Sequence, residues 1–123
     1  MDLLEARHIL ADLLAEKLSL TPDRTLFLNT LPPGAQEGLT LAITGIQPGT
    51  PENAAEITAE ITGTFESEND LCSYLAQLQD LFRQPCPAGF LFWQISGTVK
   101  LGVLPGETMD RNTFQLTAVI ALV

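Results

Sequence analysis

The clearest alternation of apolar and polar positions in the chain lies in residues 56–65, EITAEITGTF. Its odd-numbered positions are apolar or glycine, and its even-numbered positions are only Glu and Thr. A period of two residues is typical of a β-strand with one buried face and one solvated face. We therefore predict a strand at residues 56–65, whose solvated face is acidic and rich in threonine.

The rest of the chain contains further strand patterns and two amphipathic helices. Strands are predicted at residues 25–30, 39–46, 89–96, 98–104 and 113–123. Helices are predicted at residues 2–18 and 67–83, where apolar side chains recur every three or four positions. Ser67 is the expected cap of the second helix, with Asp70 three residues later. Proline, glycine and polar residues predict loops at residues 31–38, 47–55 and 104–112.

The order of these elements predicts an α+β fold. Helices and strands are segregated more than alternated, which favours a mostly antiparallel sheet of about five to six strands with two α-helices packed on one face. A Ser-Gly pair between residues 89–96 and 98–104 predicts that these two strands form a hairpin. The length of 123 residues predicts a single domain over residues 1–123.

Charge narrows the classes of partner. The net charge is −9 at pH 7, and no Lys or Arg lies between Arg24 and Arg83. Such a chain is not expected to bind DNA or RNA through a basic patch. No apolar run reaches the roughly 20 residues that a membrane-spanning helix needs, and the first residues lack the basic region of a signal peptide. We therefore expect a cytoplasmic protein that does not contact a membrane.

Residues for catalysis are sparse in the sequence. No phosphate-binding loop, nucleophile elbow or zinc-protease motif occurs, and His8 is the sole histidine. Glu56 and Glu60 lie four residues apart on the predicted strand, about 13 Å between Cα atoms, which is too far for a carboxylate pair that serves one bond unless a neighbouring strand supplies the partner. We predict no enzyme activity, no catalytic residue, no cofactor and no metal.

The remaining reactive or aromatic side chains have structural explanations. Cys72 falls within the second predicted helix, where we expect a small buried thiol. Cys86 lies between two prolines, far in sequence from the only histidine. Trp93 is interpreted as packing in the core or at a subunit interface and not as a ligand-stacking residue.

Four segments, in this order, carry a resemblance to a known family. They are a leucine-rich opening helix (MDLLEARHILADLLAEKL), a strand, proline loop and strand (LFLNTLPPGAQEGLTLAITG), a strand that enters an acidic helix start (ITGTFESENDLCSYLAQLQDLFRQ), and a polar turn before a last strand (LPGETMDRNTFQLTAVIAL). In length, pattern and order the chain resembles the tail-terminator proteins of long-tailed bacteriophages, also called tail-completion or minor capsid proteins. The resemblance covers most of the chain.

The resemblance implies a structural function in virion assembly. Proteins of this family form homo-oligomeric rings, commonly hexameric, on the last turn of the tail tube, where they stop tube polymerisation and join the tube to the head-connector protein. The genome passes through the ring without specific binding. The resemblance also implies assembly in the bacterial host cytoplasm and incorporation into the virion tail, or a prophage-encoded cytoplasmic protein.

The ring function assigns roles to three sets of residues. A wall that repels DNA weakly would keep the genome sliding, and the residues predicted to face the lumen are Glu56, Thr58, Glu60 and Thr62. Residues predicted at the subunit interface are Trp93, Val119, Ala121 and Val123. Loops with turn residues often carry recognition, and the predicted axial contacts are Pro32, Pro33, Gln36, Glu107, Asp110 and Arg111.

Other interpretations of the same features remain open. One is an acidic protein-binding module of the DNA-mimic type, which occupies the basic surface of a partner; the net charge of −9 supports it, but 17% charged residues is modest for a mimic. Another is a small-molecule-binding or enzymatic α+β domain, supported only by Trp93 and the two thiols. The acidic strand face could also serve solubility alone.

Overall fold

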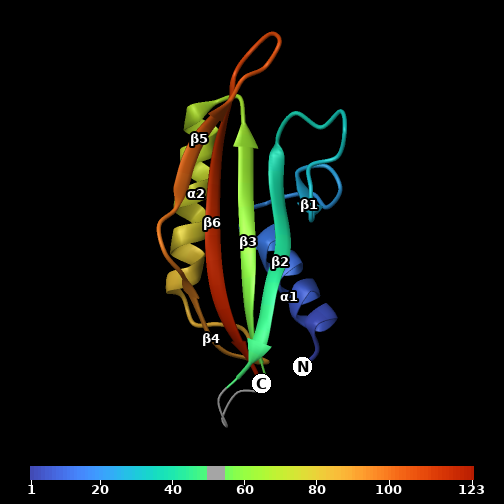
Figure 1. Ribbon diagram of the computed structural model, residues 1–123, viewed down its shortest axis with the longest axis vertical. Helices are drawn as coiled ribbons and strands as arrows, with labels where there is room; N and C mark the ends of the chain where they lie inside the picture. Colours follow the sequence, from blue (N-terminus) through green and yellow to red (C-terminus); the bar gives the residue numbers. More distant parts are fainter. Residues whose placement is uncertain (50–54) are drawn as a thin grey trace.

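Residues 1–49 and 55–123, which the computed structural model describes, form two helices and six strands in the predicted order (Figure 1). These elements are α1 (Leu3–Lys17), β1 (Leu26–Leu28), β2 (Gly38–Pro48), β3 (Ala55–Phe65), α2 (Glu68–Arg83), β4 (Phe90–Ile95), β5 (Lys100–Leu104) and β6 (Arg111–Leu122). All six strands belong to one sheet, so the α+β class is confirmed.

The sheet is built around the pairing of β3 with β6. Its strand order is β1-β2-β3-β6-β4, and β5 also pairs with β6. β3 and β6 are antiparallel over eleven residue pairs, from Ala55 opposite Leu122 to Phe65 opposite Asn112. Among the paired strands of the described residues, only β1 and β2 pair in parallel. The sheet is therefore mostly antiparallel, as predicted.

β4 and β5 do not form the predicted hairpin. Both pair antiparallel with β6, where β4 borders residues 118–122 and β5 borders residues 111–115. They therefore run in the same direction, end to end along one edge of the sheet. After β4 the chain stays beside β6, because the Ser96 amide donates to the Thr117 carbonyl at 2.8 Å. The chain therefore continues in the same direction through the Ser-Gly pair. The hairpin is formed instead by β5 and β6.

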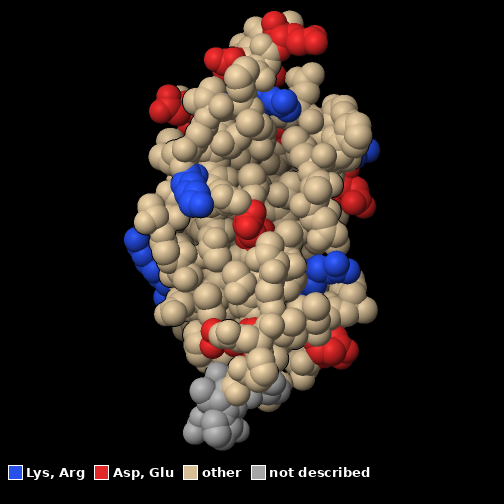
Figure 2. Space-filling model, in the orientation of Figure 1, with Lys and Arg blue, Asp and Glu red and all other residues tan. Residues whose placement is uncertain are grey.

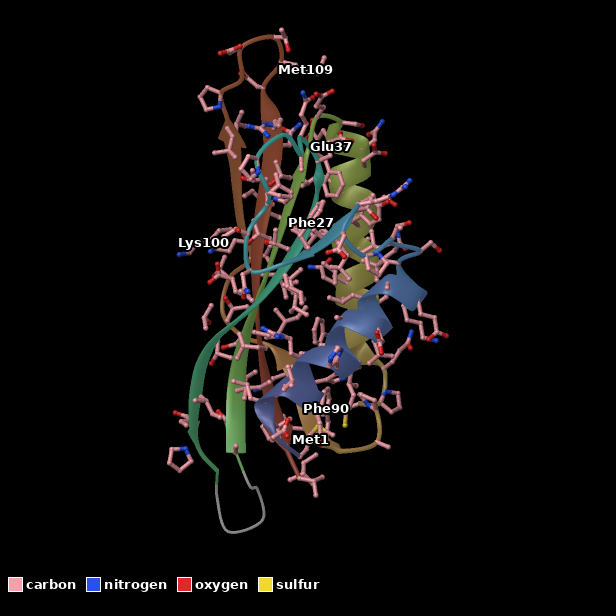
Figure 3. All side chains as sticks on the ribbon, turned by 90° about the vertical axis from the view of Figure 1, so that its right-hand side faces the viewer. Met1, Phe27, Glu37, Phe90, Lys100 and Met109 are labelled. Carbon is pink, nitrogen blue, oxygen red and sulfur yellow. The ribbon has the colours of Figure 1, made fainter. Side chains whose placement is uncertain are left out.

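Both helices cover the same face of the sheet, as predicted. Figure 3 shows α1 and α2 on one side of the strands, and the opposite face carries no helix. The core lies between these two layers. It contains buried side chains from α1 and α2 and, from the two central strands, Ile57, Ala59, Ile61, Phe114, Leu116, Ala118 and Ile120.

The sequence correctly predicts the cap of α2, but it does not correctly predict the burial of Cys72 in the same helix. The Ser67 hydroxyl accepts from the Asp70 amide at 3.3 Å, which confirms the predicted cap of α2. Cys72, expected as a buried thiol, is exposed. It follows buried Leu71 directly, and one residue is about 100° of rotation around a helix. That step carries Cys72 off the stripe that faces the sheet.

The β2–β3 ladder is longer than predicted. Gln47 pairs with Glu56 and Pro48 with Ala55, so part of the predicted loop at residues 47–55 is strand. A proline is tolerated here because β1 borders β2 only along residues 39–41, which leaves the far end of β2 as an edge. Of the same predicted loop, Gly49 lies outside any strand, and residues 50–54 lie outside the described residues.

Gly63 of β3 tests how tightly the core is packed. A Cβ added there would overlap the ring of Phe114, which lies directly over the glycine and is buried. We expect Gly63→Ala to lower the free energy of unfolding by about 1–3 kcal/mol, as overpacked core positions do. Urea denaturation of the purified chain measures this change.

The matched control is Gly45→Ala in β2. A Cβ there would make ordinary contacts of 3.7 Å with Thr58. Its unfolding free energy should stay close to that of the wild type. Equal stability of the Gly63→Ala and Gly45→Ala variants would contradict the packing of Phe114 over Gly63.

Candidate functional site

The open face of the sheet, which we define as the face without helices, contains the four residues predicted to face a lumen. Glu56, Thr58, Glu60 and Thr62 alternate with buried residues of β3 and are all half-buried. Strand pairing adds threonines from β2 and β6 to the same face. Its threonines include Thr40, Thr58, Thr62, Thr64, Thr113 and Thr117. The face is therefore a broad hydroxyl-rich surface and not a strip confined to one strand.

The acidic residues of the open face have polar and basic neighbours from other strands. The Gln47 amide donates to a Glu56 carboxylate oxygen at 2.8 Å, and the Gln115 amide donates to Glu60. Lys100 pairs with Gln115 in register and lies on the same face (Figure 3). The sheet thus brings one basic residue to the face of the acidic strand, although no Lys or Arg lies near that strand in the sequence. Figure 2 views this face and shows scattered charges on a largely uncharged surface.

Trp93 does not lie on a surface that a neighbouring subunit could contact. Its side chain is 8% exposed and packs edge-on to Phe82 of α2, with 5.0 Å between ring centroids. Its indole N–H donates to the Gln84 carbonyl at 2.8 Å. Trp93 stands opposite Ile120 in the sheet, on the helix-covered side. Register therefore assigns Trp93 to the core, which is one of the two positions expected for it, and not to the predicted interface.

The other three predicted interface residues differ in accessibility. Ala121 is fully buried, although it lies on the open face between Glu56 and Phe92 in the paired strands. Val119 is half-buried on the open face, and Val123 is exposed just beyond β6. Only Val119 and Val123 are therefore accessible to another molecule.

β5 is an exposed apolar edge that the sequence patterns did not identify. Every residue of β5 is exposed, with Leu101 at 70% and Val103 at 60% of their reference areas. Along the described chain, β6 is the one strand that pairs with β5, so its other edge is free for hydrogen bonds. The sequence features that could have indicated an edge strand here are Lys100 and Gly102, because charged residues and glycine are common in edge strands.

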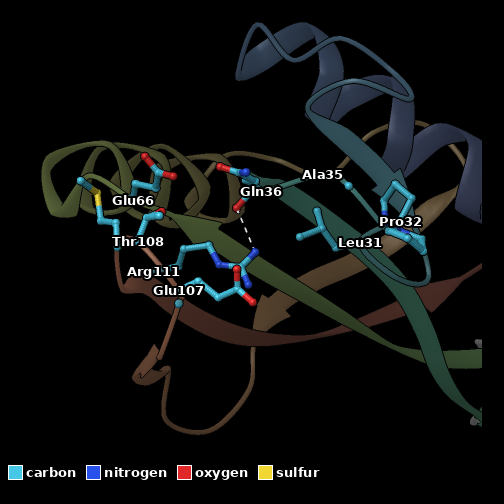
Figure 4. Close-up of a pocket in the computed structure, with 12 residues that line it drawn as sticks. Leu31, Pro32, Ala35, Gln36, Glu66, Glu107, Thr108 and Arg111 are labelled. Carbon is cyan, nitrogen blue, oxygen red and sulfur yellow. Dashed lines mark hydrogen bonds between the residues drawn. The ribbon is translucent and has the colours of Figure 1, made fainter.

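Two of the predicted contact loops meet at one end of the molecule. Residues 31–36, after β1, and residues 106–111, between β5 and β6, line a groove of about 600 Å³ (Figure 4). We call it the end groove. Its lining includes Pro32, Pro33, Gln36, Glu107 and Arg111. Asp110 is not among the lining residues, and its carboxylate accepts from the Gly106 amide at 3.4 Å within the turn. Five of the six predicted axial residues therefore share one site.

Side-chain hydrogen bonds hold the walls of the end groove together. The Arg111 guanidinium donates to the Gln36 carbonyl at 3.4 Å, across 75 residues of sequence (Figure 4). The Glu37 carboxylate accepts from the Glu66 amide at 2.9 Å, and the Asn112 side chain donates to the Glu66 carbonyl at 3.1 Å. The proline loop, the start of β6 and the entry to α2 are thereby fastened to one another.

The reactive side chains lie apart from these surfaces. Cys86 is half-buried and its thiol donates to the Phe90 carbonyl at 3.4 Å, while His8 is exposed on α1. Within residues 1–49 and 55–123, no three His, Cys, Asp or Glu side chains are grouped so that they could hold a metal ion. In the same ranges, neither helix combines the length and the apolar character needed to cross a membrane.

Comparisons with known proteins gave no family assignment. No protein-family model matches the sequence, and no curated protein matches it significantly. The surfaces described above and the resemblance in sequence pattern are therefore the basis for a function.

A substitution of Glu37 tests whether its hydrogen bond to the Glu66 amide stabilises the end groove. Glu37→Ala removes the acceptor of the Glu66 amide, and we expect a loss of about 0.5–1.5 kcal/mol in unfolding free energy. The Glu66 amide should also exchange its hydrogen faster than in the wild type, measured by NMR hydrogen exchange.

Glu107→Ala serves as the control, because this exposed carboxylate lies in the same groove and is not needed by the Glu66 amide. Its stability and the exchange rate at Glu66 should match those of the wild type. Unchanged exchange in Glu37→Ala would show that Glu37 does not fasten the proline loop to the entry of α2.

Proposed function

We propose that the chain is a structural virion assembly protein of the tail-terminator type. Its copies form a closed ring on the end of a tail tube, stop tube polymerisation and present the opposite surface to the head connector. The observation that carries the proposal is the exposed apolar edge at β5, on a sheet whose two edges are complementary in strand direction. Contacts between copies, and not a chemical step, are then the basis of function.

The strand directions support a head-to-tail ring. β4 and β5 are antiparallel to β6, β6 is antiparallel to β3, and β3 is antiparallel to β2. β2 and the parallel β1, at the other edge, therefore run opposite to β4 and β5. If neighbouring copies stand the same way up, the edge of one meets the edge of the next in antiparallel orientation. Such a contact uses two different surfaces and closes into a ring by rotation.

The two faces of the sheet suit the two sides of such a ring. With the helices on the outside, the open face lines the lumen and places Glu56, Thr58, Glu60 and Thr62 along the channel. Threonine hydroxyls and hydrogen-bonded carboxylates give a wetted surface with little attraction for a polyanion. The helices would then face solvent or the outer components of the tail.

The two ends of the molecule are equally distinct. The end groove, with Pro32, Gln36 and Arg111, lies at one end, and the β2–β3 ladder ends at Pro48 and Ala55 at the other (Figure 1). A ring between two different partners, the tail-tube protein and the head-connector protein, needs two different axial surfaces. The difference between the ends supports this placement.

Assembly through β5 is tested with Leu101→Glu/Val103→Glu. We expect the purified wild type, concentrated or mixed with a tail-tube protein of a long-tailed phage, to form rings visible by negative-stain electron microscopy. The double variant should remain a 13.3 kDa monomer by light scattering, because two carboxylates on a free strand edge oppose strand pairing. Circular dichroism checks that the variant is folded.

The control replaces exposed residues on α2, a helix that the proposed ring keeps outside the strand-edge contacts. Cys72→Glu/Ala76→Glu changes the charge by the same amount and should still form rings. A wild type that stays monomeric with the tube protein, but binds a basic partner with one-to-one stoichiometry, would contradict the ring and support the DNA-mimic interpretation.

The lumen assignment is tested by reversing charge on the open face. We expect rings of Glu56→Lys/Glu60→Lys to bind DNA that threads the lumen, with an affinity that falls steeply with salt. Fluorescence anisotropy of labelled DNA measures binding. Glu5→Lys/Glu68→Lys makes the same charge change on the helices. Equal DNA binding by both sets of rings would contradict a lumen lined by the open face.

A further inference from the structure

The end groove combines apolar walls with an excess of negative charge. Its apolar lining comes from Leu31, Pro32, Pro33, Ala35 and Met109, and the Met109 side chain is 56% exposed. Exposed methionine is common at surfaces that bind peptides, because its flexible side chain adapts to a partner. From this combination we infer that the end groove binds an extended peptide segment that carries both apolar and basic side chains.

The charge of the groove selects the partner. Glu66 and Glu107 line it, Glu37 and Asp110 stand immediately beside the lining, and Arg111 is the one basic residue among them. The Arg111 guanidinium already donates to the Gln36 carbonyl. The two lining carboxylates outnumber the one lining guanidinium, which leaves the site net negative, so we expect a bound segment to bring positive charge. Electrostatic complementarity of this kind favours basic partners and disfavours acidic ones.

The shape of the groove favours an extended backbone over a small molecule. Its volume of about 600 Å³ lies in the range of ligand sites, but it is open to solvent between two loops. Two adjacent prolines, Pro32 and Pro33, form part of one wall, and the β5–β6 turn forms the other. A segment laid between these walls would expose its own backbone to water and insert alternate side chains, as extended peptides do in grooves.

The groove is preformed, which lowers the cost of binding. The Arg111–Gln36 and Glu37–Glu66 hydrogen bonds hold both walls before any ligand arrives. A site that does not need to be ordered on binding retains more of its interaction energy as affinity. The inference rests on the proposed function for the identity of the partner, since a protein at this end of a ring would be the tail-tube or the head-connector protein.

The test begins with a library of random 12-residue peptides displayed on beads and selected on the intact wild-type chain. We expect enriched sequences to combine Lys or Arg with apolar residues. A counter-selection on Ala35→Arg, which places bulk and positive charge in the groove, should not enrich the same sequences. Glu107→Lys, at an exposed turn position that tolerates substitution, is a second blocked variant in case Ala35→Arg does not fold.

The strongest enriched peptide is then measured by titration calorimetry at low salt. We expect Glu66→Gln/Glu107→Gln to bind it about three- to tenfold more weakly, as the loss of two solvent-accessible charge contacts predicts. Glu5→Gln/Glu16→Gln on α1 removes the same charge away from the groove and should bind as the wild type does. NMR shifts on binding should concentrate at Gln36, Gly106 and Arg111.

Four outcomes would overturn the inference. In the selection, these are no enrichment over blank beads, enrichment of acidic or uncharged peptides, and binding of the same peptides by both blocked variants. In the titration, it is equal weakening of binding by the α1 control. Peptide binding is measured without tube protein, so it is independent of ring formation. A chain that binds peptides but forms no ring contradicts the proposed function, and a chain that forms rings but binds no peptide contradicts only this inference.

Discussion

The pairing of β3 with β6 is the interaction on which the rest of the structure depends. Each strand has an apolar residue at every second position along its centre, and the antiparallel register places Ile57, Ala59 and Ile61 opposite Ile120, Ala118 and Leu116. Ile57, Ile61, Leu116 and Ile120 therefore form one continuous apolar surface, which both helices cover. A shift of one residue in either strand would send its apolar set to the solvated face. The core, the open face and the position of every other strand follow from this register.

Local patterns were sufficient for the elements and the class of fold. The alternation in residues 56–65 and the stripes of both helices depend on neighbours within a few residues, and a sequence displays such neighbours directly. The cap at Ser67 is local in the same sense. The prediction for Cys72 was wrong because the apolar stripe of a helix does not show whether a residue at the border of the stripe is buried or exposed.

Non-local contacts were beyond those patterns. The end-to-end placement of β4 and β5 depends on which residues of β6 each one borders, and the burial of Trp93 depends on the face that this pairing selects. Lys100 joins the open face only through its partner on β6. The loops of the end groove were each identified as contact segments, but their meeting results from the tertiary fold. The Arg111–Gln36 hydrogen bond spans 75 residues and has no signature in either loop.

The place of β6 in the sheet also has a consequence for how the chain folds. β6 is the last of the six strands to be synthesised, yet it lies between β3 and the strands β4 and β5. While a ribosome is still making the chain, β3 has one unpaired edge, and β4 and β5 have no strand to join. Folding into the complete sheet must wait until β6 has emerged, and such long-range pairing is slow. During that interval the exposed edges can pair with other chains, so nascent copies made close together are at risk of aggregation.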